Sequence, residues 1–208
     1  MLDVHGLGYT RDADGFRAID SPMPFHGWAV VTKPDAPICD LIAPLIRQRG
    51  FGVKDASGIY DLTDVGLAKM FEATWLWHVP DAVADVADWE HIATPEALLR
   101  WEDAWRGTQF LDQRQFPDQI LKRSDVRTWG RQIDGGFDAG VIANVSADCV
   151  SVSNCFGTDA RPATTALCAA FGHGKPLVGY ERGDDLTEAL ANGWQETGPL
   201  AVWVKTGL

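Results

Sequence analysis

A short apolar run near the C-terminus, residues 176–180 (PLVGY), constrains the fold most. It shows no alternation of polar and apolar residues, so a strand formed there has to be covered on both faces. Asp184 and Asp185 follow and suit the N-terminus of a helix, which is predicted to end at Asn192-Gly193 because glycine readily adopts a left-handed conformation. Residues 200–204 (LAVWV) then predict a second strand. The order of strand, helix and strand indicates an α/β chain.

A strand meander and a further helix are predicted just before this stretch. The strands cover residues 126–133, 139–145 and 149–154, with turns at 134–136 and 146–148, and the helix covers residues 162–171. The connection from 154 to 176 is long enough for a crossover and carries a helical pattern. We therefore expect residues 149–154 and 176–180 to be adjacent parallel strands, joined by a right-handed crossover. Asn154 and Tyr180 would then lie at the same edge of the sheet.

The helix with the strongest end signals is predicted at residues 94–106. Thr94 suits the N-cap, Pro95 the first helical position and Gly107 the C-terminal stop. Trp101 and Trp105 share one face with Leu98, so we expect both indoles to be buried against the sheet.

The first third of the chain predicts further short elements. We expect strands at 28–32, 58–62 and 73–80 and helices at 38–47 and 64–72. Residues 28–62 thus echo the strand, helix, Gly-aromatic pair and strand of the C-terminal stretch. A chance echo is favoured over a degenerate internal duplication, because the loops and strand lengths differ.

Charge and composition exclude several classes of protein. The 208 residues carry a net charge of -11, which argues against a nucleic-acid or anionic-membrane partner. No apolar run approaches the roughly 20 residues needed to cross a bilayer, and the N-terminus has no signal-peptide pattern, so we expect a cytoplasmic protein. The four cysteines form no CxxC pair, and we expect buried, reduced thiols and no metal site.

The order of elements over residues 94–205, with Gly193-Trp194 before the last strand, resembles the GNAT superfamily of N-acetyltransferases. The resemblance implies an α/β (α+β) fold with a mixed, mostly antiparallel sheet, a parallel strand pair at a V-shaped split, and helices on both faces. It assigns residues 64–208 to a GNAT-like domain and leaves residues 1–63 as an N-terminal extension or an extra strand-helix-strand unit. It also implies acetyl-CoA or another acyl-CoA in the split, with its pyrophosphate at a helix N-terminus.

The sequence departs from the family at two places. The loop after the fourth strand reads CFGTDARP (residues 155–162) and lacks the usual Arg or Gln, two residues, Gly, one residue, and Gly or Ala. Ala189 stands where many members carry the tyrosine that protonates the departing thiolate. Both departures indicate a degenerate acyl-CoA loop.

The resemblance and the polar residues near the split together give the candidate site residues. The candidates are Tyr180 and Glu181 for catalysis, Ser153, Asn154, Gly157 and Arg161 for the cofactor, and Trp75, Trp77 and Asn144 for the substrate pocket. Glu181 would accept a proton from an amine if burial raises its pKa, and Tyr180 would donate one.

Each candidate also has a structural interpretation. Ser153 and Asn154 equally suit a polar strand face and a turn. Glu181 suits a solvated loop with a local ion pair, Asn144 suits a hydrogen bond to a neighbouring bulge, and the tryptophans suit the core.

The predicted function is transfer of an acyl group from acyl-CoA to a small amine. The alternative is a non-catalytic binding or accessory protein on a GNAT-like scaffold that has lost acyl-CoA binding, which the loop and Ala189 favour. A homodimer is left open.

Overall fold

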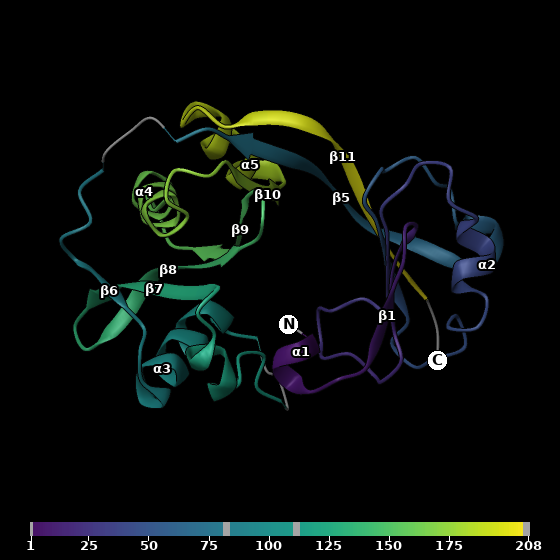
Figure 1. Ribbon diagram of the computed structural model, residues 1–208, viewed down its shortest axis with the longest axis horizontal. Coiled ribbons are helices and arrows are strands. Elements are labelled where there is room, and N and C mark those ends of the chain that lie inside the picture. The colour runs from purple at the N-terminus through teal and green to yellow at the C-terminus, as the bar shows by residue number, and fades with distance from the viewer. Residues whose placement is uncertain (1, 81–83, 110–112, 206–208) are drawn as a thin grey trace. The chain divides into compact units, whose positions relative to one another are not determined.

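The computed structural model describes residues 2–80, 84–109 and 113–205. The chain is a mixed α/β protein with two compact units, and each unit is described by itself (Figure 1). Unit 1 comprises Met1–Trp75 and Thr197–Leu208, and unit 2 comprises Leu76–Glu196. The expected division was 1–63 and 64–208. In the structure, both ends of the chain belong to unit 1.

The strands of the described residues form a mixed sheet in the order β1-β2-β3-β4-β11-β5-β10-β9-β8-β7-β6. The strands are β1 (Tyr9–Arg11), β2 (Gly15–Ala18), β3 (Ala29–Val31), β4 (Gly52–Asp55), β5 (Leu67–His78), β6 (Trp89–His91), β7 (Val126–Ile133), β8 (Gly136–Val145), β9 (Val150–Phe156), β10 (Leu177–Glu181) and β11 (Gln195–Lys205). The α-helices are α1 (Leu2–His5), α2 (Ile38–Ile42), α3 (Pro95–Arg106), α4 (Arg161–Phe171) and α5 (Gly183–Ala191). Two 3₁₀ turns, η1 (Thr63–Val65) and η2 (Asp118–Lys122), complete the elements. The mixed sheet with helices on both faces confirms the expected fold class.

Unit 2 is built on the predicted meander. β7 pairs with β8 and β8 with β9, both antiparallel, and β10 pairs with β9 in parallel. The parallel pair and the helix between its strands were both predicted from the sequence. Helices α3 and α4 lie on opposite faces of this part of the sheet (Figure 1). Successive strand residues point to opposite faces, so each helix has its own row of side chains to pack on.

A pair of glycines makes room for α3. Gly130 and Gly140 lie opposite each other on β7 and β8. A Cβ added at Gly140 would lie 2.3 Å from the Trp101 Nε1 atom, and one at Gly130 would lie 3.0 Å from Trp101 Cδ1. The indole therefore rests directly on the backbone of the sheet, where its Nε1 donates a 2.8 Å hydrogen bond to the Trp129 carbonyl. Trp101 is fully buried as predicted, whereas Trp105 is half-buried.

The other face of the meander packs under α4. Its core contains side chains that alternate with the glycines of the α3 face, such as Trp129, Val141 and Val152, and it includes Cys168 from α4. Trp194, just after α5, belongs to the same cluster.

Hydrogen bonds to a buried carboxylate hold the C-terminal end of α3. The Glu102 carboxylate accepts hydrogen bonds from Arg106, Arg114 and the Gln115 backbone.

Unit 1 has its own hydrophobic core on the α2 side of its sheet. β3 and β4 are parallel, and α2 lies between them in the sequence. Ile38 and Ile42 of α2 share a buried cluster with residues of β3 and β4. The helix is shorter than the expected residues 38–47, since Pro44 lacks the backbone donor that a longer helix needs.

The same succession of elements occurs in both units. An antiparallel meander leads to a strand, a helix and a parallel strand, as β3-α2-β4 in unit 1 and as β9-α4-β10 in unit 2. In both cases the next strand in the sheet order comes from the other half of the chain. β4 pairs with β11 from the end of the chain, and β10 has β5 from its first half as neighbour. This repeat differs from the echo expected from the sequence, which compared residues 28–62 with the stretch that forms β10, α5 and β11.

Two predicted elements of the first third are wrong. Residues 64–72 were expected to be helical, but Gly66, with φ of 81°, ends the short η1 turn and β5 begins at Leu67. The spacing of apolar residues in so short a run does not separate a helix from a strand. Residues 58–62 form a loop instead of a strand, because the buried Asp55 carboxylate accepts hydrogen bonds from the backbone of Ser57 and Tyr60.

The cysteines are free thiols, but they are not uniformly buried. Cys168 is buried, Cys149 and Cys155 are half-buried, and Cys39 is exposed on the outer side of α2. No helix of the described residues is long and apolar enough to cross a membrane.

Replacement of Trp101 by alanine should lower the free energy of unfolding by about 3–5 kcal/mol, the usual cost of emptying an aromatic core site. The cost arises because the glycines beneath the indole have no side chains to fill the cavity. Urea unfolding at equilibrium measures it. Leu99→Ala on the exposed side of the same helix is the control and should change stability by less than about 0.5 kcal/mol. Equal losses in the two variants would contradict the packing described.

Candidate active site

The candidate site lies where β9 and β10 separate in unit 2. The parallel register joins Leu177 to Val150 and Val178 to Ser151. The described residues show no further pair between the strands, although β9 continues to Phe156 and β10 to Glu181. We call this region the sheet split. Backbone groups that a neighbouring strand would otherwise satisfy face each other across it, and such groups need a partner.

A β-bulge in β9 lies at the sheet split. Gly140 and Ile142 are two residues apart on β8, whereas their partners Phe156 and Ser153 are three residues apart on β9. The extra residue lies at Asn154 or Cys155, and Asn154 has a left-handed φ of 54°. A bulge leaves one residue out of the ladder and turns its backbone groups away from the neighbouring strand. The bulge therefore adds backbone hydrogen-bonding groups to the sheet split.

An ion pair between a buried arginine and a half-buried glutamate joins the two elements that flank the sheet split. Arg161, the first residue of α4, is only 5% exposed and donates a 2.7 Å hydrogen bond to Glu181 at the end of β10. Its guanidinium carbon lies 5.8 Å from the centre of the Trp194 ring. Burial raises the pKa of Glu181 above its usual value, although the Arg161 charge acts in the opposite direction. Partial desolvation thus makes the Glu181 carboxylate easier to protonate than an exposed one.

Cys155 lies beside this ion pair. Its Sγ is 3.9 Å from an Arg161 nitrogen. Burial raises the pKa of the Cys155 thiol to about 12, despite the nearby guanidinium. A thiol with that pKa carries almost no thiolate at neutral pH and is a poor nucleophile. Cys155 is therefore not a candidate nucleophile.

The loop between β9 and α4 is packed against the hairpin of β7 and β8. Gly157 has φ of 101°, and a Cβ there would lie 2.3 Å from the Ala139 Cβ. The Arg131 guanidinium donates hydrogen bonds to the Asp138 carboxylate and to the Thr158 carbonyl. Gly157 is therefore required by packing on β8.

The cavity next to this loop is small and acidic. Its volume is about 30 Å³, room for about one water molecule. Asp185 and Glu188 of α5 line it together with Arg161. Arg161 is the only basic residue in the loop sequence 155–162, and its charge is already paired with Glu181. The small volume and acidic lining of this cavity do not fit a pyrophosphate.

The remaining predicted residues are distributed more widely. Ser153 is exposed on β9, and Asn154 donates a side-chain hydrogen bond to it. Tyr180 is 36% exposed, and it precedes Glu181 on β10, so the two side chains point to opposite faces. These residues and Arg161 are brought together around the sheet split.

Three predicted pocket residues lie elsewhere. Asn144 pairs with Ser151, which lies three residues before Asn154 on β9. Its side-chain amide donates hydrogen bonds to the Asp125 carbonyl and carboxylate. Trp77 is half-buried in β5. Trp75 belongs to unit 1, where its Nε1 donates to the Ala56 carbonyl at 2.8 Å. The structure gives Asn144 and Trp75 structural hydrogen bonds.

The sequence analysis did not predict that Trp194 and His78 contact each other. His78 stacks on Trp194 with ring centres 5.3 Å apart, and its Nδ1 lies 3.2 Å from the Gly193 carbonyl. Trp194 in turn donates to the Thr165 hydroxyl of α4. The Gly-aromatic pair was visible in the sequence, but the residue on which it stacks lies more than one hundred positions away. In the described residues, no group of three or more His, Cys, Asp or Glu side chains could hold a metal ion.

Solved structures with the same fold are numerous, although no family model and no curated protein sequence matches the chain. A conserved protein of unknown function from Staphylococcus epidermidis superposes with a TM-score of 0.66 at 7% identity, over 96% of this chain and 93% of that one. A putative GNAT-family acetyltransferase from Novosphingobium aromaticivorans gives 0.60 at 12% identity, over 94% and 89%. A GCN5-related N-acetyltransferase from Kribbella flavida gives 0.59 at 14% identity, over 97% and 90%. At these identities the likeness shows the fold, which is GNAT-like.

Thiol reactivity tests the environment of the sheet split. In a Cys39→Ser, Cys149→Ser variant, the native protein should react with a disulfide reagent at pH 8 much more slowly than free cysteine. With a pKa of about 12, only about one Cys155 thiol in ten thousand is ionised at pH 8. Unfolding in guanidinium should release both remaining thiols. Fast labelling of Cys155 in the folded variant would show that the site is not desolvated.

Proposed function

We propose that the chain is a GNAT-like acyltransferase that uses the sheet split of unit 2 to transfer an acyl group from a thioester such as acetyl-CoA to a small amine. The proposal depends above all on the bulge at Asn154, which lies where β9 and β10 separate. A thioester arm laid along this edge would meet backbone groups that have no strand partner. The GNAT-like fold of the solved structures supports the assignment without identifying a substrate.

The backbone of β9 would bind and polarise the acyl carbonyl. N–H groups fixed by the sheet need no reorganisation when negative charge develops on an oxygen, which is why such donors accelerate acyl transfer. Ser153 and Asn154 lie at the bulge and are the residues best placed to present them. The thioester, when bound, supplies an acyl carbon that an amine can attack directly.

Glu181 would take the proton of the attacking amine. Its carboxylate is held by Arg161 at 2.7 Å, so its position is fixed, and burial weakens its hold on charge. As the new C–N bond forms and the C–S bond breaks, the amine proton passes to Glu181 and the leaving sulfur takes a proton from the opposite side. Tyr180 on the other face of β10 is the candidate donor for that second proton.

The acidic side chains of α5 that line the small cavity beside Arg161 predict which part of the thioester is recognised. Because Asp185 and Glu188 surround the only cation of the loop, a nucleotide diphosphate gains no charge pairing there. Acetyl-pantetheine and acetyl-CoA should therefore raise the melting temperature to a similar extent. Saturation at 100 times the dissociation constant corresponds to about 2.7 kcal/mol. No shift with either thioester at millimolar concentration would favour a scaffold that has lost the acyl donor.

Substitution of the base gives a sharper test. Glu181→Gln keeps an acceptor for Arg161 but removes the proton acceptor, so acyl transfer should fall by about 10²–10⁴-fold with little change in KM for the thioester. Glu96→Gln at an exposed position of α3 is the matched control and should retain the rate. Activity of the parent protein should rise with pH as Glu181 loses its proton, and the raised pKa of Glu181 shifts this rise to higher pH than for an exposed glutamate. A fully active Glu181→Gln variant would contradict the proposed role.

A further inference from the structure

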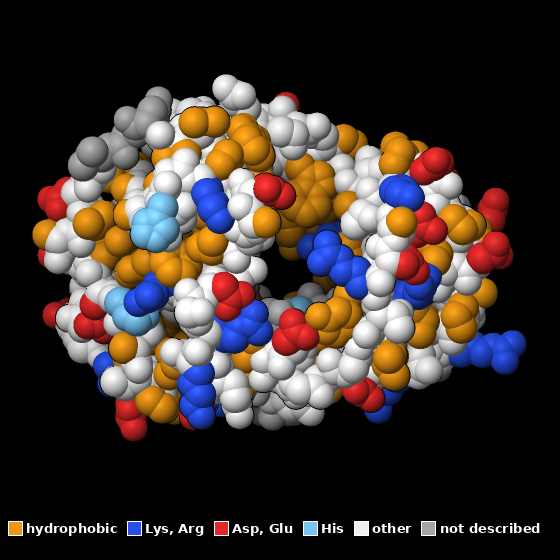
Figure 2. Space-filling model, in the orientation of Figure 1, with side chains coloured by type: hydrophobic (Ala, Val, Ile, Leu, Met, Phe, Trp, Pro, Cys, Tyr) orange, Lys and Arg blue, Asp and Glu red, His pale blue; other side chains and the backbone are white. Residues whose placement is uncertain are grey.

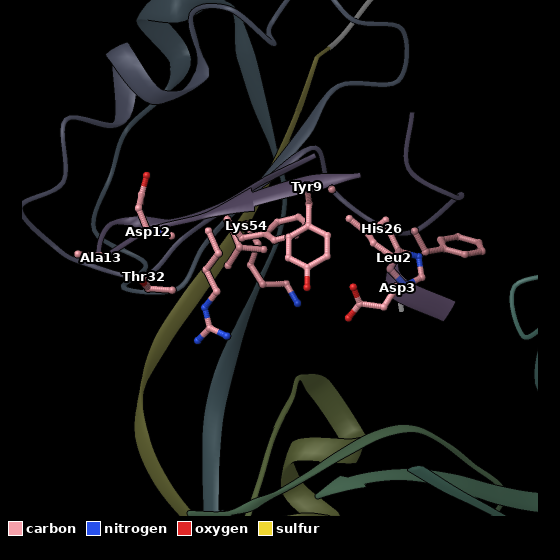
Figure 3. A pocket seen from close by; sticks show the side chains of 14 residues that line it. Leu2, Asp3, Tyr9, Asp12, Ala13, His26, Thr32 and Lys54 are labelled. Atoms are coloured by element: carbon pink, nitrogen blue, oxygen red, sulfur yellow. The ribbon is translucent and has the colours of Figure 1, made fainter. Parts of the chain in front are cut away.

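An open cavity of unit 1 lies on the face of its sheet that α2 leaves uncovered. Its volume is about 650 Å³, within the range of small-molecule sites. Strands β1 to β4 provide the floor and α1 contributes to the wall (Figure 3). The site of acyl transfer proposed above involves none of these residues.

Strand register explains which side chains form the floor. Arg11 lies opposite Phe16, Phe16 opposite Val30, and Val30 opposite Lys54, so four neighbouring strands place one row of side chains on the same face. The alternate residues, such as Val31 and Val53, are buried on the α2 side. The row therefore has an apolar middle and a cation at each end.

Aromatic side chains add to the apolar lining of the cavity. The rings of Tyr9 and Phe16 lie with their centres 5.0 Å apart, and Phe25 also lines the cavity. Rings of this kind provide large flat surfaces for an apolar ligand body at low cost in side-chain entropy. Figure 3 shows the side chains of Tyr9, Lys54 and Asp3 directed into the same open space.

The charges of the lining are unevenly paired. Asp12 is occupied by Arg17 and by the backbone of Asp14 and Gly15. Arg11 takes part in no ion pair within residues 2–80, 84–109 and 113–205. Burial lowers the pKa of His26, so its ring adds no charge at neutral pH. With the Asp12–Arg17 pair set aside, the formal charges of the lining are two cations, Arg11 and Lys54, and one acid, Asp3, an excess of one positive charge.

This local excess is unusual for the chain. The sequence has 29 acidic and 18 basic residues, and acidic and basic side chains are interspersed over the face seen in Figure 2. A cavity with two cations and several aromatic rings thus differs in character from an average surface of this protein.

We propose that the unit 1 cavity is a binding site for a small organic anion with an apolar body, such as an aryl carboxylate. Lys54 and Arg11 bind the carboxylate, and Phe16, Val30 and Tyr9 contact the ring. A carboxylate paired with two cations in a partly enclosed site gains charge-assisted hydrogen bonds that a neutral analogue lacks.

Isothermal titration with three matched probes tests the proposal. Benzoate, benzyl alcohol and benzylamine share the ring and differ in charge. We expect benzoate to bind about tenfold or more tightly than the other two, which is the usual effect of one charge-assisted contact. Equal binding of the three probes, or no heat with benzoate at millimolar concentration, would overturn the proposal.

Variants locate the binding. Lys54→Gln and Arg11→Gln should each weaken benzoate binding by about tenfold, and Lys54→Glu should reverse the preference toward benzylamine. Arg47→Gln removes a positive charge from an exposed position of unit 1 outside the cavity and should bind benzoate like the parent. The melting temperature of each variant confirms that it is folded. Unchanged benzoate affinity in folded Lys54→Gln and Arg11→Gln proteins would exclude this cavity as the site.

Discussion

The parallel pairing of β9 with β10, and its early end, is the constraint on which unit 2 depends. Two parallel strands cannot be joined by a hairpin, so the chain has to cross over through α4. The crossover brings the first residue of α4 to the end of β10, where Arg161 meets Glu181. The strands pair over two positions only, and the bulge at Asn154 lies just beyond. The sheet split and the ion pair thus follow from the parallel pairing and its crossover, and the bulge lies at the same place.

The ion pair sets the chemistry of this region. Desolvation favours the neutral form of a carboxyl group, while a cation at hydrogen-bond distance favours its charged form. Glu181 is subject to both effects, and burial has the larger influence on its pKa. Cys155 is subject to the same desolvation and remains a thiol. The same surroundings therefore favour Glu181 as a proton acceptor and Cys155 as an inert side chain.

The two units use one order of elements for different surfaces. In unit 2, helices cover both faces of the meander, and the proposed site is a narrow edge of backbone. In unit 1, α2 covers the face that carries Val31 and Val53, and the opposite face forms an open cavity of about 650 Å³. The strand that completes each half of the sheet order comes from the other half of the chain, as β11 beside β4 and β5 beside β10. The topology is repeated, whereas the side chains that it presents are not.

Local patterns in the sequence determined much of unit 2. Thr94, Pro95 and Gly107 fixed the ends of α3, because capping acts over a few neighbouring residues. The lack of alternation in residues 176–180, with a long helical connection before it, indicated the parallel strand. The GNAT-like fold was expected from the resemblance of residues 94–205 to that superfamily, and Glu181 was expected at the close of the strand at residues 176–180.

Only the tertiary structure decided how distant residues meet. The partner of Glu181 is twenty positions away on α4, and the bulge at Asn154 depends on the register between β8 and β9. Residues 67–72 became part of β5, which lies beside β11 in the sheet order, and sheet formation overrode the helical spacing of residues 64–72. The cavity of unit 1 needs Arg11, Phe16, Val30 and Lys54 in one row across four strands. Such pairings depend on contacts across the sheet, which no local pattern in the sequence encodes.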